Sequence, residues 1–408
     1  MEFKKTTLDN GLTLIGEVNT SAKSAAVGFF VKTGARDETE QVNGVSHFLE
    51  HMLFKGTEKL DALQVNEAFD RTGAQFNAGT SEENTVYYAA VLPEYLLEVT
   101  RLWIELMRPA LRDDDFSIEK NVIKQEIAMY KDQPSFDVID RCRRLHFQDH
   151  PCGYSVLGSE QSIDGLTNRQ MQDYFGLRYV PNNMVVACSG NFDWDEFRSV
   201  VEKPCSNWLG QAVARPLTYY TGSRKKERLE KSSLSCEHLC FMSEAVSSQD
   251  PRRFAAYLLA TIVGDDVGSR FYWELVDKAL AEAAAMQFGP MDGMGILCSY
   301  ICCSSRNMQT VMSTVTSIFD ALDRDGVTPG ELTKAKNKIL SALVIKNELP
   351  MGRLLDLGFN WIYLGQYRSI EDDIRAIRAV TVDDVNALIT QLRPGDFTQY
   401  SIGPGRSI

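Results

Sequence analysis

Apolar residues follow two different spacings along the chain, and these spacings predict alternating strands and helices. Short β-rich segments such as AAVGFFVKTG (25–34) and TVYYAAVL (85–92) are typical of strands, whereas EYLLEVTRLWIELMRPAL (94–111) has the spacing of a longer helix. The first residues alternate around an Asn-Gly turn, as in a β-hairpin. This mixture predicts an α+β fold in which sheets are backed by helices.

Two pairs of segments recur in the same order, which indicates an internal duplication. The segments FSIEKNVIKQEI (116–127) and LTKAKNKILSAL (332–343) superpose without a gap around a shared Lys-Asn-x-Ile core. Further on, IDGLTNRQM (163–171) resembles IRAVTVDDV (377–385), and each has a Thr at an expected helix N-cap. Two matches at a similar offset predict a duplicated domain of about 200 residues, a common domain size.

The duplication sets the expected domain organisation. The seam is expected in the polar, proline-containing stretch 204–226. The first domain would then span residues 1–212 and the second residues 213–408. We expect two homologous domains, each a mostly antiparallel sheet backed by helices.

The superposed segments also serve as an internal comparison of side chains. Glu119 lies opposite Ala335, and Glu126 lies opposite Ala342. Two helical turns separate the two glutamates, so both carboxylates project from one face. The first half therefore carries two carboxylates on one helix face that the second half lacks.

The stretch SHFLEHMLF (46–54) contains His47, Glu50 and His51 in the order H-x-x-E-H. The helix expected here ends before Gly56, and it places the two imidazoles one turn apart, as two ligands of one Zn²⁺. Glu50 lies beside them and reaches a water on the metal without being a ligand. This is the inverse of the H-E-x-x-H arrangement, and it predicts the same hydrolytic chemistry.

A catalytic zinc needs a third protein ligand and an open position for water. Glu126, which lies well beyond His51 in the sequence, is the candidate from the internal comparison. Glu119 is a candidate for a hydrogen bond to one of the ligands. Because only the first half carries these residues, we expect one zinc per chain.

Composition and charge limit the possible binding partners and cellular location of the protein. A net charge of -12 and a pI near 5.1 argue against nucleic-acid or anionic-membrane partners. No apolar run approaches the length that a membrane-spanning helix needs, and the N-terminal residues lack a signal-peptide core. Nine cysteines without a C-x-x-C pair indicate reduced thiols, and we expect a cytoplasmic protein.

Four segments in order, HFLEH, GAQFNAGTSEENTVYYAAVL, EKNVIKQEI and HPCGYSVLGS, carry a resemblance that covers essentially the whole chain. The sequence resembles the inverted-zincin peptidases that include pitrilysin, insulin-degrading enzyme and the mitochondrial processing peptidase. In length it is similar to their small bacterial, processing-peptidase-like members. The resemblance implies that His47, His51 and Glu126 bind zinc, that Glu50 is the general base, and that Glu119 supports the site.

The resemblance also implies a place for the substrate. The strand near Phe76, Asn77, Ala78, Gly79 and Thr80 would pair with an extended peptide by β-addition. Zinc would then polarise the scissile carbonyl, and the general base would activate the water and return its proton to the leaving amine.

The second half departs from the family pattern. Family members carry an Arg and a Tyr that contact substrate, but the stretch GSRFYWELVDKALAEAAAMQF (268–288) places Val276 and Glu282 at those positions. Either a partner subunit supplies the missing groups, or substrate binds differently, or activity is weak.

Two further groups of metal-binding residue types are interpreted as structural. His146 and His150 repeat the helical spacing but lack an adjacent Glu, and a proline follows His150 as at a helix end. Cys236, His238 and Cys240 alternate as on one face of a strand, without an obvious fourth ligand, and we interpret them as a buried strand face.

Three functional hypotheses follow. The first is a zinc endopeptidase that encloses unfolded peptides in a chamber between two-domain units. The second is a scaffold subunit without proteolytic activity. The third is the zinc-bearing subunit of a heteromeric peptidase. A homodimer or a heterodimer with a related two-domain subunit is expected, and no feature identifies the physiological substrate.

Overall fold

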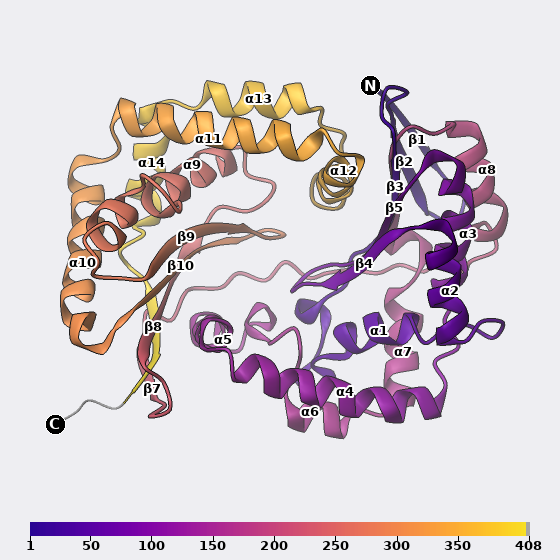
Figure 1. Cartoon of the computed structure of the whole chain (residues 1–408), viewed down its shortest axis with the longest axis horizontal. Helices are drawn as coiled ribbons and strands as arrows, with labels where there is room; N and C mark the ends of the chain where they lie inside the picture. Colours follow the sequence, from indigo (N-terminus) through magenta and orange to yellow (C-terminus); the bar gives the residue numbers. More distant parts are fainter. Residues whose placement is uncertain (405–408) are drawn as a thin grey trace. The chain divides into compact units, whose positions relative to one another are not determined.

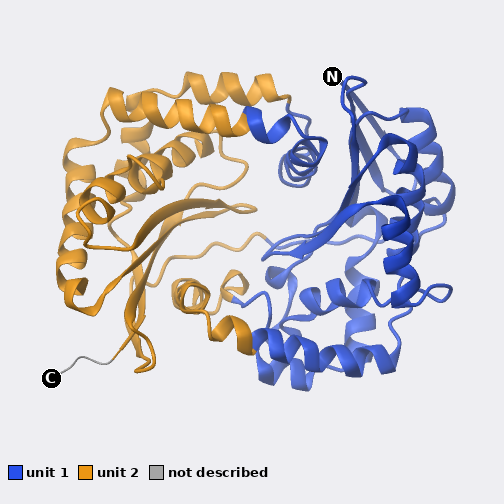
Figure 2. Cartoon of the chain, in the orientation of Figure 1, with its two compact units in different colours: residues 1–127, 154–216, 344–368 blue, residues 128–153, 217–343, 369–408 orange. Residues whose placement is uncertain are grey.

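The computed structural model describes residues 1–404, which form two compact units (Figures 1 and 2). Unit 1 is built from residues 1–127, 154–216 and 344–368, and unit 2 from residues 128–153, 217–343 and the described chain from 369 onward. Each unit thus includes a segment from the other half of the chain. The predicted α+β class with two duplicated domains is confirmed. No helix in the described part of the chain is long and apolar enough to cross a membrane.

Unit 1 contains a six-stranded sheet in the order β1-β2-β6-β3-β5-β4. All neighbouring strands are antiparallel except β2 and β6. The strands are β1 (Glu2–Thr7), β2 (Thr13–Val18), β3 (Ala25–Val31), β4 (Gln75–Thr80), β5 (Thr85–Val91) and β6 (Met184–Gly190). Within the described chain β4 pairs only with β5, which makes it an edge strand. The strand predicted near residues 76–80 belongs to β4.

Helices cover both faces of this sheet. Every residue of β3 is buried, which explains why its sequence is a continuous apolar run. Phe29 packs into the core that includes Trp103, and Phe30 on the opposite face packs with Leu354. The helices are α1 (Val45–Leu53), α2 (Ala62–Thr72), α3 (Leu96–Leu106), α4 (Asp113–Lys131, which continues into unit 2), α6 (Glu160–Gly165), α7 (Asn168–Arg178), α8 (Trp194–Cys205) and α12 (Pro350–Leu364).

Unit 2 repeats the β2-β6-β3-β5-β4 part of this topology. Its five-stranded sheet has the order β7-β11-β8-β10-β9, and only β7 and β11 are parallel. The strands are β7 (Lys226–Glu230), β8 (Cys236–Ala245), β9 (Ala283–Pro290), β10 (Gly295–Ser304) and β11 (Thr398–Gly403). The helices are α5 (Pro134–Phe147), α9 (Arg253–Gly264), α10 (Met308–Asp325), α11 (Pro329–Asn347), α13 (Ile370–Ala379) and α14 (Val382–Leu392), with one π-helical segment (Tyr272–Val276).

Helix positions also reflect the duplication. The helices α4 and α11 each have 19 residues and begin at positions 113 and 329, while α5 and α12 begin at Pro134 and Pro350. Both pairs are therefore separated by the same offset along the chain. The predicted N-caps are present, since the side chains of Thr167 and Thr381 accept hydrogen bonds at the starts of α7 and α14.

The exchange of segments between halves has a packing cause. The helix α12 buries Leu354 and Leu357 against the sheet of unit 1, and α5 buries Val138 and Cys142 against the sheet of unit 2. Each helix thus covers a sheet formed by the other half. The boundary expected after residue 212 stays a prediction about the duplicated sequence. In the structure the chain passes between unit 1 and unit 2 after residues 127, 216 and 368, among other points.

Candidate metal centre

The helix that carries H-x-x-E-H begins at a position that only glycine fits. Gly44, the N-cap of α1, has φ 95°, and a Cβ there would lie 2.7 Å from the carbonyl oxygen of Leu157. The carboxylate of Glu38 accepts hydrogen bonds from the backbone N–H groups of Gly44 and Ser46, at 2.7 and 2.8 Å. Because glycine has no side chain to cap the helix, the Glu38 carboxylate accepts hydrogen bonds from these free amides instead.

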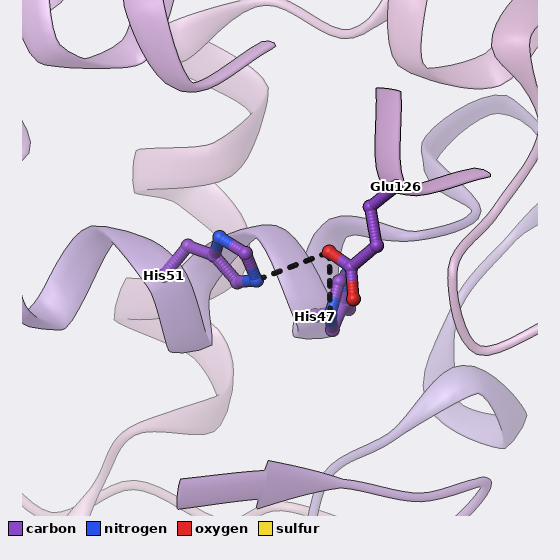
Figure 3. A group of neighbouring side chains, drawn as sticks. All are labelled: His47, His51 and Glu126. Atoms are coloured by element: carbon purple, nitrogen blue, oxygen red, sulfur yellow. Dashed lines mark ion pairs between the residues drawn. The ribbon is translucent and has the colours of Figure 1, made fainter. Parts of the chain in front are cut away.

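Three donor atoms converge from α1 and α4 (Figure 3). Oε2 of Glu126 lies 3.7 Å from Nε2 of His47 and 3.5 Å from Nε2 of His51. For zinc bonds of about 2.0–2.1 Å, two ligand atoms at tetrahedral corners are about 3.4 Å apart. The predicted residues are thus brought together at distances that fit one zinc ion, with two nitrogen donors, one oxygen donor and a remaining corner for water.

Glu119 orients one of these histidines. Its Oε1 lies 2.8 Å from Nδ1 of His51, and its Oε2 forms an ion pair with the ammonium group of Lys55 at 2.5 Å. With Nδ1–H donating to the carboxylate, the Nε2 lone pair is free to face Glu126. Burial alone would raise the pKa of Glu119, but its bonds to His51 and Lys55 lower that pKa overall. Glu119 therefore remains ionised beside the site.

The two histidines differ in their electrostatic surroundings. Burial, together with the adjacent His51, lowers the pKa of His47 to about 3, so His47 stays neutral, as a metal ligand must. Burial also lowers the pKa of His51, but the hydrogen bond and charge of Glu119 outweigh it, and the pKa is raised overall.

Glu50 lies beside the three donors without joining them. The hydroxyl of Thr80, at the end of β4, donates to Oε2 of Glu50 at 2.6 Å. Burial raises the pKa of Glu50 above its ordinary value, although the Thr80 bond acts in the opposite direction. The carboxylate is held in one orientation and is more basic than an exposed glutamate.

The sequence did not predict two contacts of this centre. The ion pair between Lys55 and Glu119 and the bond from Thr80 to Glu50 both depend on tertiary packing. Lys55 lies four residues after His51, just past the end of α1 at Leu53, and this spacing is a weak signal that could have been noticed.

The structural interpretation of His146 agrees with its surroundings. It is buried in unit 2, with Nδ1 3.0 Å from Oγ1 of Thr398 and Nε2 3.4 Å from the hydroxyl of Tyr220. Nε2 of His150 lies 2.7 Å from Oγ1 of Thr218. Both histidines are thus engaged by hydroxyl groups.

Comparisons with known proteins bear on the whole chain. The family model described as "Insulinase (Peptidase family M16)" matches residues 14–160, and "Peptidase M16 inactive domain" matches residues 165–339. The "Uncharacterized zinc protease YmxG" of Bacillus subtilis is 32% identical over 411 residues, covering 98% of each chain. The chain belongs to peptidase family M16.

A second relative and a solved structure match the chain over a similar extent. An "Uncharacterized zinc protease" of Mycobacterium tuberculosis is 33% identical over 408 residues, which cover 98% of this chain and 93% of the relative. The crystal structure of a protease from Helicobacter pylori superposes with a TM-score of 0.92 at 20% identity, over 99% of this chain and 100% of the other. At this identity, the match to the Helicobacter pylori structure shows that the two chains share a fold. The resemblance drawn from the sequence motifs is confirmed at the level of the family.

Proposed function

We propose that the chain is a zinc-dependent endopeptidase that cleaves extended or unfolded peptides. The observation that carries this proposal is the convergence of His47, His51 and Glu126 with the carboxylate of Glu50 beside them. Relatives named as zinc proteases over nearly the full chain support it.

The roles of the residues follow from the donor set. Bound by His47, His51 and Glu126, zinc would polarise the scissile carbonyl and lower the pKa of the attacking water. Glu50 takes a proton from that water and returns it to the leaving amine. Thr80 holds the Glu50 carboxylate in place, and burial brings its pKa closer to neutral pH, where a general base is most effective.

The edge strand β4 is suited to hold the substrate. It pairs with β5 on one side, so its other side offers backbone N–H and C=O groups to an extended peptide. Phe76, Ala78 and Thr80 are partly buried, while Asn77 and Gly79 are exposed. Because Thr80 ends the strand and bonds to Glu50, a peptide paired with β4 would run toward the general base.

The proposed setting is the reducing cytoplasm, where the nine cysteines are stable as thiols. We further propose that two two-domain units, identical or related, enclose the peptide. A heteromeric peptidase is the second candidate, because the positions of the family's Arg and Tyr hold Val276, which packs into the core of unit 2, and the exposed Glu282. A scaffold without activity is the third.

A cleavage assay on a library of unstructured peptides separates these candidates. The zinc-loaded chain is assayed alone, after chelation, and mixed with a related subunit that lacks H-x-x-E-H but keeps the Arg and Tyr. Losing one charge-stabilising donor lowers a rate by about 10² to 10³-fold, so we expect slow cleavage alone and a rise on mixing. A kcat of about 1 s⁻¹ or more for the lone chain would refute the need for a partner. No zinc-dependent cleavage in any mixture would contradict the peptidase proposal.

A further inference from the structure

A second group of metal-binding side chains lies on the sheet of unit 2. One ligand atom from each of Cys236, Glu282 and Cys302 lies within 4.8 Å of the other two. Sγ of Cys236 is 3.5 Å from Oε1 of Glu282, and Sγ of Cys302 is 4.0 Å from Oε2. With zinc bonds of about 2.3 Å to sulfur and 2.1 Å to oxygen, adjacent tetrahedral corners are about 3.6 Å apart. The group is therefore close to the spacing of a zinc site.

The sheet itself brings these residues together. In the antiparallel pair β8 and β10, Cys236 lies opposite Ser304 and His238 opposite Cys302. Cys236 and His238 are two residues apart, so both point to the face that Cys302 shares. The backbone N–H of Glu282 donates to the carbonyl of Cys302 at 2.8 Å, which places Glu282 at the same end of the sheet. Main-chain hydrogen bonds thus position all three ligands.

Charge and exposure also favour a cation here. Glu282 is exposed, Cys236 is partly buried and Cys302 is 8% exposed, so an ion can enter from solvent. Across residues 1–404 Glu282 forms no ion pair with a lysine or arginine, and its two carboxylate oxygens lie 3.5 and 4.0 Å from the thiols of Cys236 and Cys302. As thiolates, these would give the group three negative charges. Two thiolates and one carboxylate favour zinc over magnesium or calcium, which prefer oxygen ligands alone.

We propose that Cys236, Glu282 and Cys302 bind a second zinc ion, with water in the remaining position. This inference changes the expected stoichiometry from one to two zinc ions per chain. It also revises the interpretation of Cys236 as part of a purely structural strand face, because the missing ligands come from β10 and from the residue before β9. The inference does not depend on peptidase activity.

Cobalt alone is the probe, because Co²⁺ bound to thiolates shows a sulfur-to-metal charge-transfer band that a site of two His and one Glu cannot produce. The reduced, metal-free chain is titrated with Co²⁺. We expect the band to saturate by two equivalents of Co²⁺ per chain, because the centre of His47, His51 and Glu126 takes up the other ion without producing the band. Cys236→Ser and Cys302→Ser should abolish it, and Glu126→Ala should leave it intact.

Two further variants provide a control for the thiol ligands and a test of the carboxylate ligand. Cys298→Ser removes another thiol of β10 outside the group and should retain the band, while Glu282→Gln changes an exposed side chain and should weaken cobalt binding at least tenfold without affecting the fold. Circular dichroism verifies that each variant is folded. Absence of the band in the wild-type chain, its survival in both serine variants, or unchanged affinity in Glu282→Gln would overturn the proposal. A Cys236–Cys302 disulfide that persists under reducing conditions would also overturn it.

Discussion

Replacing Glu119 with alanine should weaken zinc binding at the histidine centre although Glu119 is not one of the three converging donors. Glu119 is 3% exposed, and its carboxylate accepts from Nδ1 of His51 at 2.8 Å and pairs with Lys55 at 2.5 Å. Its loss frees the His51 ring to rotate and leaves Lys55 without its anion, close to the metal. Removing such an outer hydrogen bond typically lowers metal affinity 10- to 100-fold, or about 1.4–2.7 kcal/mol.

The helix itself should tolerate this change, because Ala335 occupies the equivalent buried position in α11. Zinc affinity is measured by competition with a chromophoric chelator for the wild type, Glu119→Ala and Glu119→Gln. The glutamine can still accept from His51 but carries no charge, so we expect an intermediate affinity. Asp114→Ala removes an exposed carboxylate from the same helix and serves as the matched control. If Glu119→Ala binds zinc within twofold of the wild type, the orienting role is wrong.

Three further predictions concern the ligands, the fold and its pH dependence. Glu126→Ala should lower the zinc content by one ion per chain in metal analysis, and retention of that ion would refute this ligand. Arg353 and Glu17 form a buried, two-point ion pair at 2.8 and 2.6 Å, so Arg353→Ala should lower the free energy of unfolding by about 3–5 kcal/mol in denaturant titrations. The exposed Arg375→Ala should change it by less than about 1 kcal/mol, and equal effects would contradict the argument. Burial, with a contribution from the charge of Arg143, lowers the pKa of His146 from 6.5 to about 4, and the unfolded chain therefore takes up this proton first as pH falls. Stability should drop between pH 6.5 and 4 by up to about 3 kcal/mol more in the wild type than in His146→Gln, and identical pH profiles would refute this.

Local spacing accounts for the parts of the centre that the sequence predicted. His47 and His51 share a face because they are four residues apart on one helix, and Glu119 and Glu126 share a face because they are seven apart on another. The internal repeat related α4 to α11 and showed which carboxylates were specific to the first half. These inferences required no knowledge of which strands pair.

Contacts set by strand register could not be predicted in this way. Cys236 and Cys302 are distant in the sequence, and they approach only because β8 pairs with β10 in one particular alignment. A shift of one residue would move Cys302 to the other face of the sheet. The sequence also could not predict that α5 and α12 each cover the sheet formed by the other half of the chain, since an apolar helix face does not reveal which sheet it covers.

The rate of peptide cleavage by Glu50→Gln tests the account most directly. The variant and the wild type are loaded with zinc and assayed on the same unfolded peptide. Both are assayed either alone or with a related subunit, whichever gives the faster cleavage by the wild type. The amide nearly preserves the shape of the carboxylate and can still accept the bond from Thr80, but it cannot take a proton from the attacking water. We predict unchanged zinc content and a kcat lower by about 10² to 10⁴-fold. A decrease of less than tenfold with zinc in place would show that another group takes the proton.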